Sequence, residues 1–186
     1  MCDAGDSGKL LTELGLCPCC GALCSDIDGP MHPYMVASAG CWAAFGVLQA
    51  DEAARFGYPL VHGLIVDAYA ASHGGDGNER RDRQSVCIHL IALCAVIDGA
   101  ATPRGRVVLL QRLTRRKVEW PVLNRPAGVP RLSHTHAAGA ADIEDYTKRA
   151  REWAGAIWSF WYPEHDRIRT MLDAQPGEPL TPRRRA

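Results

Sequence analysis

The chain has 186 residues, of which 47% are hydrophobic and 23% are charged, a composition typical of a globular protein of about one domain and not of a disordered one. Its 21 Lys and Arg residues balance its 21 Asp and Glu residues, so no net field favours nucleic acid or an acidic membrane as a partner. Apolar runs are shorter than the about 20 residues that a membrane span requires, and no signal-peptide pattern opens the chain; we therefore expect a cytoplasmic protein that does not associate with membranes.

Residues 1–40 are predicted to be irregular, because glycine and proline interrupt them too often for a long helix. Six of the eight cysteines lie within the first 41 residues. In a chain without a secretory signal, the cytosol keeps thiols reduced, so clustered cysteines indicate a metal site or reactive thiols.

The segment CPCCG (17–21) contains the spacing Cys17-x-x-Cys20, with which a tight turn directs two thiolates at one tetrahedral ion. His32, Cys41 and Cys24 lie close enough in sequence to complete a structural zinc site. The preferred set is Cys17, Cys20, His32 and Cys41, whose last ligand would attach the segment to the first helix.

Several alternatives to this set stay open at the level of sequence. Cys19 or Cys24 can replace one of the preferred ligands, or the thiols can be packed without any metal. A redox dithiol formed by Cys17 and Cys20, or by Cys19 and Cys20, is disfavoured because no βαβ pattern surrounds these residues.

Four helices are predicted in the middle of the chain. They cover residues 41–56, 59–72, 84–97 and 103–116. The first ends at Gly57-Tyr58-Pro59, the third is apolar almost all round and should be buried, and the fourth is amphipathic, with arginines on its solvent side. The pattern predicts a mostly α protein: a helical bundle behind a small Cys-rich zinc knuckle.

An extended connector over residues 120–136 precedes a long helical pattern over 141–174, which Pro163 should kink or divide. Apolar and aromatic residues recur along this pattern at steps of three and four, as expected for a buried stripe: Trp153, Ile157, Trp161, His165, Ile168 and Leu172. The expected organisation is a metal-binding segment (1–40) packed on a bundle (41–175), followed by a flexible tail (176–186).

Histidines on separate predicted helices are the candidates for acid–base chemistry. Each of His62, His73, His89 and His165 can be a hydrogen-bonded core residue, but bundle cores also hold metal and acid–base sites. Asp67 lies about 140° round the helix from His62, so it is expected to face another helix. Two sets follow: acid–base or substrate-binding residues (His62, Asp67, His73, His89) and ligands of an open metal site (His62, Asp67, His89, His165).

Two further histidines, His134 and His136, lie in the predicted connector. They are weaker candidates, because alternate residues of an extended segment project to opposite sides.

The motifs CPCCG (17–21), GPMHPYM (29–35), GCWAAFG (40–46), HGLIVDAYAASH (62–73), QSVCIHL (84–90) and WAGAIWSFWYPEH (153–165) occur in this order. Together they resemble an uncharacterised bacterial family, the domain of unknown function DUF5946. The resemblance marks nine positions as typical of the family: Cys17, Cys20, His32, Cys41, His62, Asp67, His73, His89 and His165. It implies no reaction.

The chain departs from the family pattern at three places. Ser72 replaces a glutamine, Gly74 replaces a proline, and Glu164-His165 replaces a pair of histidines. The last change puts in doubt any role that needs both histidines.

The sequence therefore predicts a small zinc-binding helical protein that performs metal-dependent or His-mediated acid–base catalysis on a small molecule. In one variant the cysteine site itself is catalytic, with three ligands and an open position. The alternative is an adaptor without enzymatic activity that docks a partner protein through the aromatic C-terminal helix, with Trp158 as its contact residue. DNA binding is disfavoured by the neutral charge.

Overall fold

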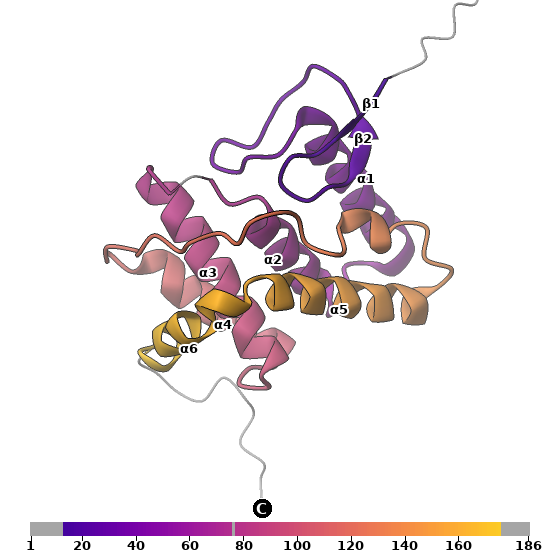
Figure 1. Ribbon diagram of the computed structural model, residues 1–186. Coiled ribbons are helices and arrows are strands. Elements are labelled where there is room, and N and C mark those ends of the chain that lie inside the picture. Colours follow the sequence, from indigo (N-terminus) through magenta and orange to yellow (C-terminus); the bar gives the residue numbers. More distant parts are fainter. Residues whose placement is uncertain (1–12, 76, 176–186) are drawn as a thin grey trace, which may run out of the picture.

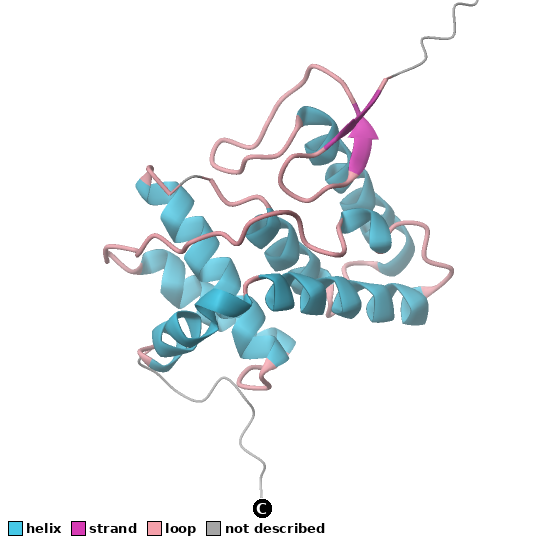
Figure 2. Cartoon of the chain, in the orientation of Figure 1, coloured by secondary structure: helices cyan, strands magenta, loops and turns pink. Residues whose placement is uncertain are grey.

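The computed structural model describes residues 13–75 and 77–175. Within them, a small antiparallel hairpin precedes six α-helices, so the protein is mostly α, as predicted (Figures 1 and 2). The elements are β1 (Leu14–Leu16), β2 (Leu23–Ser25), α1 (Ala39–Phe56), α2 (His62–Ser72), α3 (Arg80–Ile97), α4 (Pro103–Arg115), the 3-10 turn η1 (His134–His136), α5 (Ile143–Phe160), the 3-10 turn η2 (Tyr162–Glu164) and α6 (His165–Asp173).

The helices begin and end where local chemistry predicts. The Ser38 side chain caps α1 by accepting a hydrogen bond from the Cys41 amide, and Gly57 ends it in the left-handed conformation, with a φ of 63°. Thr102 caps α4, whose first residue is Pro103. These caps explain why predicted boundaries lie close to the observed ones.

The core lies between α2, α3 and α5. Helix α2 packs against α3, α4 and α5, and α3 also packs against α6. The stripe predicted for the C-terminal pattern is buried except at its last residue, Leu172, which is partly buried. Trp153, Ile157 and Ile168 are fully enclosed. Pro163 divides that pattern, because the chain leaves α5 through η2 before it enters α6.

The N-terminal region differs from the prediction, because residues 14–25 form a hairpin in which Leu14 pairs with Ser25 and Leu16 pairs with Leu23. Strands of three residues are too short to show alternating hydrophobicity, so periodicity does not predict them. Figure 1 shows this hairpin at one end of the molecule, beside α1. The predicted tail (176–186) and the first part of the Cys-rich segment, including Cys2, lie outside the described residues.

No helix among the described residues is both long enough and apolar enough to cross a membrane.

Candidate metal centre

Three segments that are distant in sequence bring four ligand atoms together. Cys17 and Cys20 come from the loop of the hairpin, Cys41 from the first turn of α1, and His73 from the residue that ends α2. All four residues are buried, and their ligand atoms lie within 4.8 Å of one another. We call this set the four-ligand cluster.

The distances within the cluster fit a tetrahedral zinc ion. Zn–S bonds of about 2.3 Å and Zn–N bonds of about 2.0–2.1 Å give tetrahedron edges of about 3.8 Å between two sulfurs and about 3.6 Å between sulfur and nitrogen. The Sγ atoms of Cys20 and Cys41 are 3.7 Å apart. His73 Nε2 lies 3.5 Å from Cys17 Sγ and 3.4 Å from Cys41 Sγ. Three thiols and one imidazole are therefore placed as a closed zinc site requires.

Neighbouring groups hold these ligands in the form that binds metal. His73 Nδ1 donates a hydrogen bond of 2.8 Å to the Tyr69 carbonyl, which leaves Nε2 with its lone pair facing the thiols. The Tyr69 hydroxyl donates to Cys41 Sγ at 3.6 Å. Tyr69 is itself fixed by stacking on Phe45, with ring centroids 3.9 Å apart.

The electrostatics of the cluster favour a cation. Hydrogen bonds from the Cys20 and Cys41 thiols hold the pKa of Cys17 well below its ordinary value. The same contacts, together with burial, raise the pKa of Cys41, and the contact with Cys17 raises the pKa of Cys20 to about 12. A bound divalent ion would favour the ionised form of all three thiols, because a coordinating thiol is deprotonated.

Backbone contacts explain why the cluster forms. Gly21 takes a φ of 69° and donates its amide to the Cys17 carbonyl at 2.9 Å, which closes the loop. A Cβ atom on Gly40 would lie 1.8 Å from the Ser25 carbonyl oxygen, so only glycine lets α1 begin this close to β2. The Val36 amide donates to the His73 carbonyl at 2.9 Å and so brings the end of α2 beside the segment between β2 and α1.

The structure places His32 outside the cluster and puts His73 in the position that the sequence assigned to His32. The His32 ring packs edge-on against Tyr34 and Trp42, with centroids 4.3 and 5.1 Å apart. Proximity in sequence suggested His32, whereas the fold returns the end of α2 to the hairpin. The Gly-Gly pair that follows His73 predicts the end of a helix, but it does not predict that this end lies beside the hairpin.

The four residues predicted for acid–base chemistry do not converge. His73 belongs to the four-ligand cluster, and His62 pairs with Glu52, with His62 Nδ1 2.5 Å from Glu52 Oε2. Only Asp67 and His89 meet, with Asp67 Oδ1 2.7 Å from His89 Nδ1. Glu52 was not among the predicted residues, and it is completely buried on α1.

Asp67 lies at the centre of a buried charge cluster. Arg106 of α4 donates to both carboxylate oxygens through Nε and Nη2, the second bond being 2.5 Å long. Gly63 makes room for this contact, since a Cβ there would lie 2.4 Å from Arg106 Nη1. His89 reaches the surface in a pocket of about 370 Å³. The other residues of the pocket are mostly polar: Tyr34, Arg81, Gln84, Ser85, Ile88 and Thr114.

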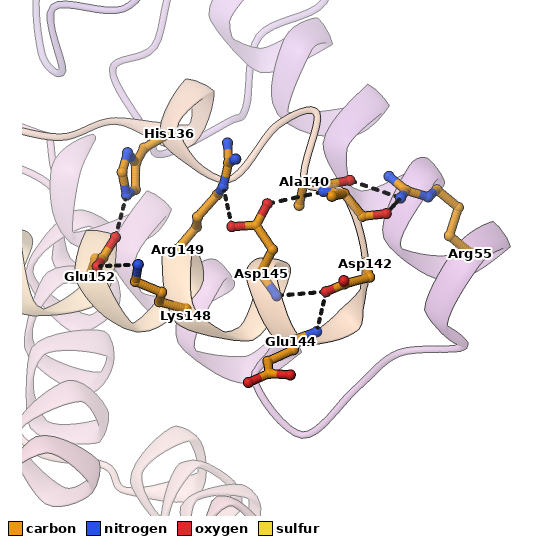
Figure 3. A network of polar contacts seen from close by, with 10 residues as sticks. Arg55, His136, Ala140, Asp142, Glu144, Asp145, Lys148, Arg149 and Glu152 are labelled. Carbon is orange, nitrogen blue, oxygen red and sulfur yellow. Dashed lines mark hydrogen bonds and ion pairs between the residues drawn. The ribbon is translucent and has the colours of Figure 1, made fainter.

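The remaining predicted residues have local partners. His165 Nε2 donates to the Trp158 carbonyl at 2.8 Å, and the two rings stack with centroids 3.7 Å apart. Trp158 is buried by this contact. His136 pairs with Glu152 at 2.9 Å on the surface (Figure 3). The predicted open metal site of His62, Asp67, His89 and His165 therefore does not form, because His62 and His165 have separate partners.

Metal content distinguishes His73 from His32. We expect His73→Ala to lower the zinc content of the purified chain, because it removes one of four ligands, whereas His32→Ala should leave the zinc content unchanged. Elemental mass spectrometry on both variants, with circular dichroism as a check on folding, measures this difference. Loss of zinc in His32→Ala with retention in His73→Ala would contradict the assignment.

A family model described as a family of unknown function (DUF5946) matches residues 15–162. The match includes the four-ligand cluster and the Asp67–His89 pair. No curated protein and no solved structure matches the chain.

Proposed function

Because the chain belongs to DUF5946, a family of unknown function, its activity must be inferred from its own residues, and we propose that it is a structural-zinc protein that performs acid–base catalysis. The observation that supports zinc is the agreement between the distances in the four-ligand cluster and the edges of a tetrahedral site. Four protein ligands leave no open position, which is typical of structural zinc.

The proposed zinc ion would stabilise the hairpin, which is too small to be stable on its own. A two-stranded hairpin is marginally stable in water, and the leucines of β1 and β2 point largely to solvent. Zinc bound by the hairpin loop, α1 and α2 would fasten this segment to the bundle. The soft thiolate-rich donor set favours zinc over magnesium or calcium.

Acid–base catalysis is assigned to His89 because a buried carboxylate fixes its ring at a pocket. When His89 Nδ1–H donates to Asp67, Nε2 is left as the proton acceptor. Arg106 pairs with Asp67 and holds the carboxylate in place. A general base held in this way fits proton abstraction from a small substrate, and Arg81 in the same pocket would pair with an anionic group on it.

This proposal predicts that His89→Ala abolishes turnover while zinc content and helix content stay the same. Removal of a general acid–base residue lowers rates by about 10²–10⁴-fold. The assay is a panel of small carboxylate and phosphate esters, lactones and amides, incubated with the unmodified chain and with the variant. His136→Ala serves as the control, because His136 pairs with Glu152 on the surface.

Two results would contradict the acid–base assignment. One is turnover that persists in His89→Ala, and the other is the absence of turnover above the uncatalysed rate across the panel. Neither result would affect the zinc site, which is measured separately.

The adaptor alternative requires an exposed Trp158. Trp158, its proposed contact residue, is covered by the His165 ring on one side, and Arg169 lies 5.7 Å from its ring centroid. Trp158 therefore belongs to the core and is not exposed to a partner.

A further inference from the structure

Cys24 and His134 form a second group of ligands with Cys41. Cys24 lies in β2 and His134 in η1, and both are buried. The three ligand atoms lie within 4.8 Å of one another. Cys41 Sγ is 3.9 Å from His134 Nδ1. Neither Cys24 nor His134 is needed by the four-ligand cluster.

We propose that Cys24, Cys41 and His134 bind a second zinc ion, which the Cys41 thiolate bridges to the first. A thiolate sulfur that binds one ion keeps lone pairs for another, so Cys41 can belong to both sites. Coordination to the second ion would deprotonate the Cys24 thiol. This proposal rests on the proposed zinc function only because Cys41 is a ligand in both sites.

The second site would have an open position, because three protein ligands leave one corner of a tetrahedron free, as in catalytic zinc sites. A groove of about 630 Å³ lies next to these ligands. Among the residues that line the groove, Ser25 and Gly40 are the sequence neighbours of Cys24 and Cys41, and His134 is itself a ligand. His134 Nε2 is buried and has no hydrogen-bond partner among the described residues, so no hydrogen bond from this atom commits the ring to another role.

The groove also indicates the chemical class of its ligand. Its wall along α1 is apolar at Ala43, Ala44 and Val47, and charged at Asp51 and Arg55. A small molecule with an apolar body and a terminal carboxylate fits both the wall and the open position on zinc. We expect such a carboxylate to bind the second ion directly.

The segment that carries His134 is held in place by polar contacts. Arg55 Nη2 donates to the Ala140 carbonyl at 2.8 Å and to the Ala141 carbonyl at 3.0 Å. Asp142 accepts from the amides of Glu144 and Asp145 and so fixes the start of α5 (Figure 3). The loop between His134 and α5 is therefore anchored to α1, which carries Cys41.

The test is the zinc stoichiometry of the full chain after incubation with excess zinc and removal of unbound ion. Elemental analysis is expected to give about two ions per chain in the unmodified protein and about one in Cys24→Ala and in His134→Ala. Cys17→Ser should lose the first ion, and Cys94→Ala, a buried thiol that contacts Asp98 instead, should keep both. Circular dichroism verifies that each variant is folded.

One ion in the unmodified chain, or two in Cys24→Ala, would overturn the second site. One ion that is lost only in Cys17→Ser would leave the first site intact, so the two proposals fail separately. Absence of zinc from the unmodified chain would overturn both.

Cobalt tests the open position. Co²⁺ in place of zinc should give a visible spectrum that changes when hexanoate is added to the unmodified chain but not when it is added to Cys24→Ala. An unchanged spectrum in the unmodified chain at saturating hexanoate would overturn the open position.

Discussion

Replacing both Cys17 and Cys20 by serine is expected to release the ion of the four-ligand cluster and to unfold the hairpin. Zinc supplies about 10–16 kcal/mol to the folding of small zinc-binding peptides, which is comparable to the about 5–15 kcal/mol that stabilises a whole domain. The hairpin has too little buried surface to replace that contribution. We expect a fall in Tm of at least about 10 °C.

Hydrogen exchange separates the hairpin from the bundle in this experiment. Amides of β1, β2 and the loop between them should lose protection in the variant, whereas α3 and α5 should remain protected, since their core residues, such as Leu90 and Trp153, do not depend on the ion. Cys94→Ala is the matched control for the loss of a buried thiol. An unchanged Tm together with a protected hairpin would show that no ion stabilises this segment.

Asp67→Asn is expected to cost about 3–5 kcal/mol of unfolding free energy, because it leaves the buried Arg106 guanidinium without its counter-charge. The Asp67 side chain is completely enclosed and the Arg106 side chain is only 8% exposed, so water cannot replace the missing carboxylate. Urea denaturation of the variant and of the unmodified chain measures the difference.

A double substitution shows whether the unpaired charge of Arg106 causes the loss of unfolding free energy. Asp67→Asn combined with Arg106→Met removes both charges, and we expect it to recover most of the lost stability. Asp98→Asn breaks an ion pair with Arg169 that is partly open to solvent, so its cost should be much smaller. A loss in Asp67→Asn no larger than that in Asp98→Asn would contradict a buried charge cluster.

The helices were predictable from the sequence because their signals are local. Periodicity, the Gly57 stop and Pro103 at a helix start act within a few residues. The same applies to the expectation that Asp67 faces another helix, which the structure explains by its contacts with His89 and Arg106. The fold class and the divided C-terminal pattern therefore followed from the sequence alone.

The candidate site was only partly predictable, because some of its residues are brought together by contacts between segments that are distant in sequence. The Cys17-x-x-Cys20 spacing is local, whereas His73 reaches the cluster through the pairing of Val36 with the residue that ends α2. Arg106 was assigned to a solvated face because most arginines on amphipathic helices are solvated. In the structure Arg106 turns inward to pair with Asp67, in the space that Gly63 leaves.

X-ray absorption at the zinc edge tests the central claim most directly, on the full chain loaded with one equivalent of zinc. The four-ligand cluster should fill first, since it offers one more protein ligand than the second site. We predict a shell of three sulfurs at about 2.3 Å and one nitrogen at about 2.0–2.1 Å. A shell of four sulfurs, or one made only of oxygen and nitrogen, would contradict a site formed by Cys17, Cys20, Cys41 and His73.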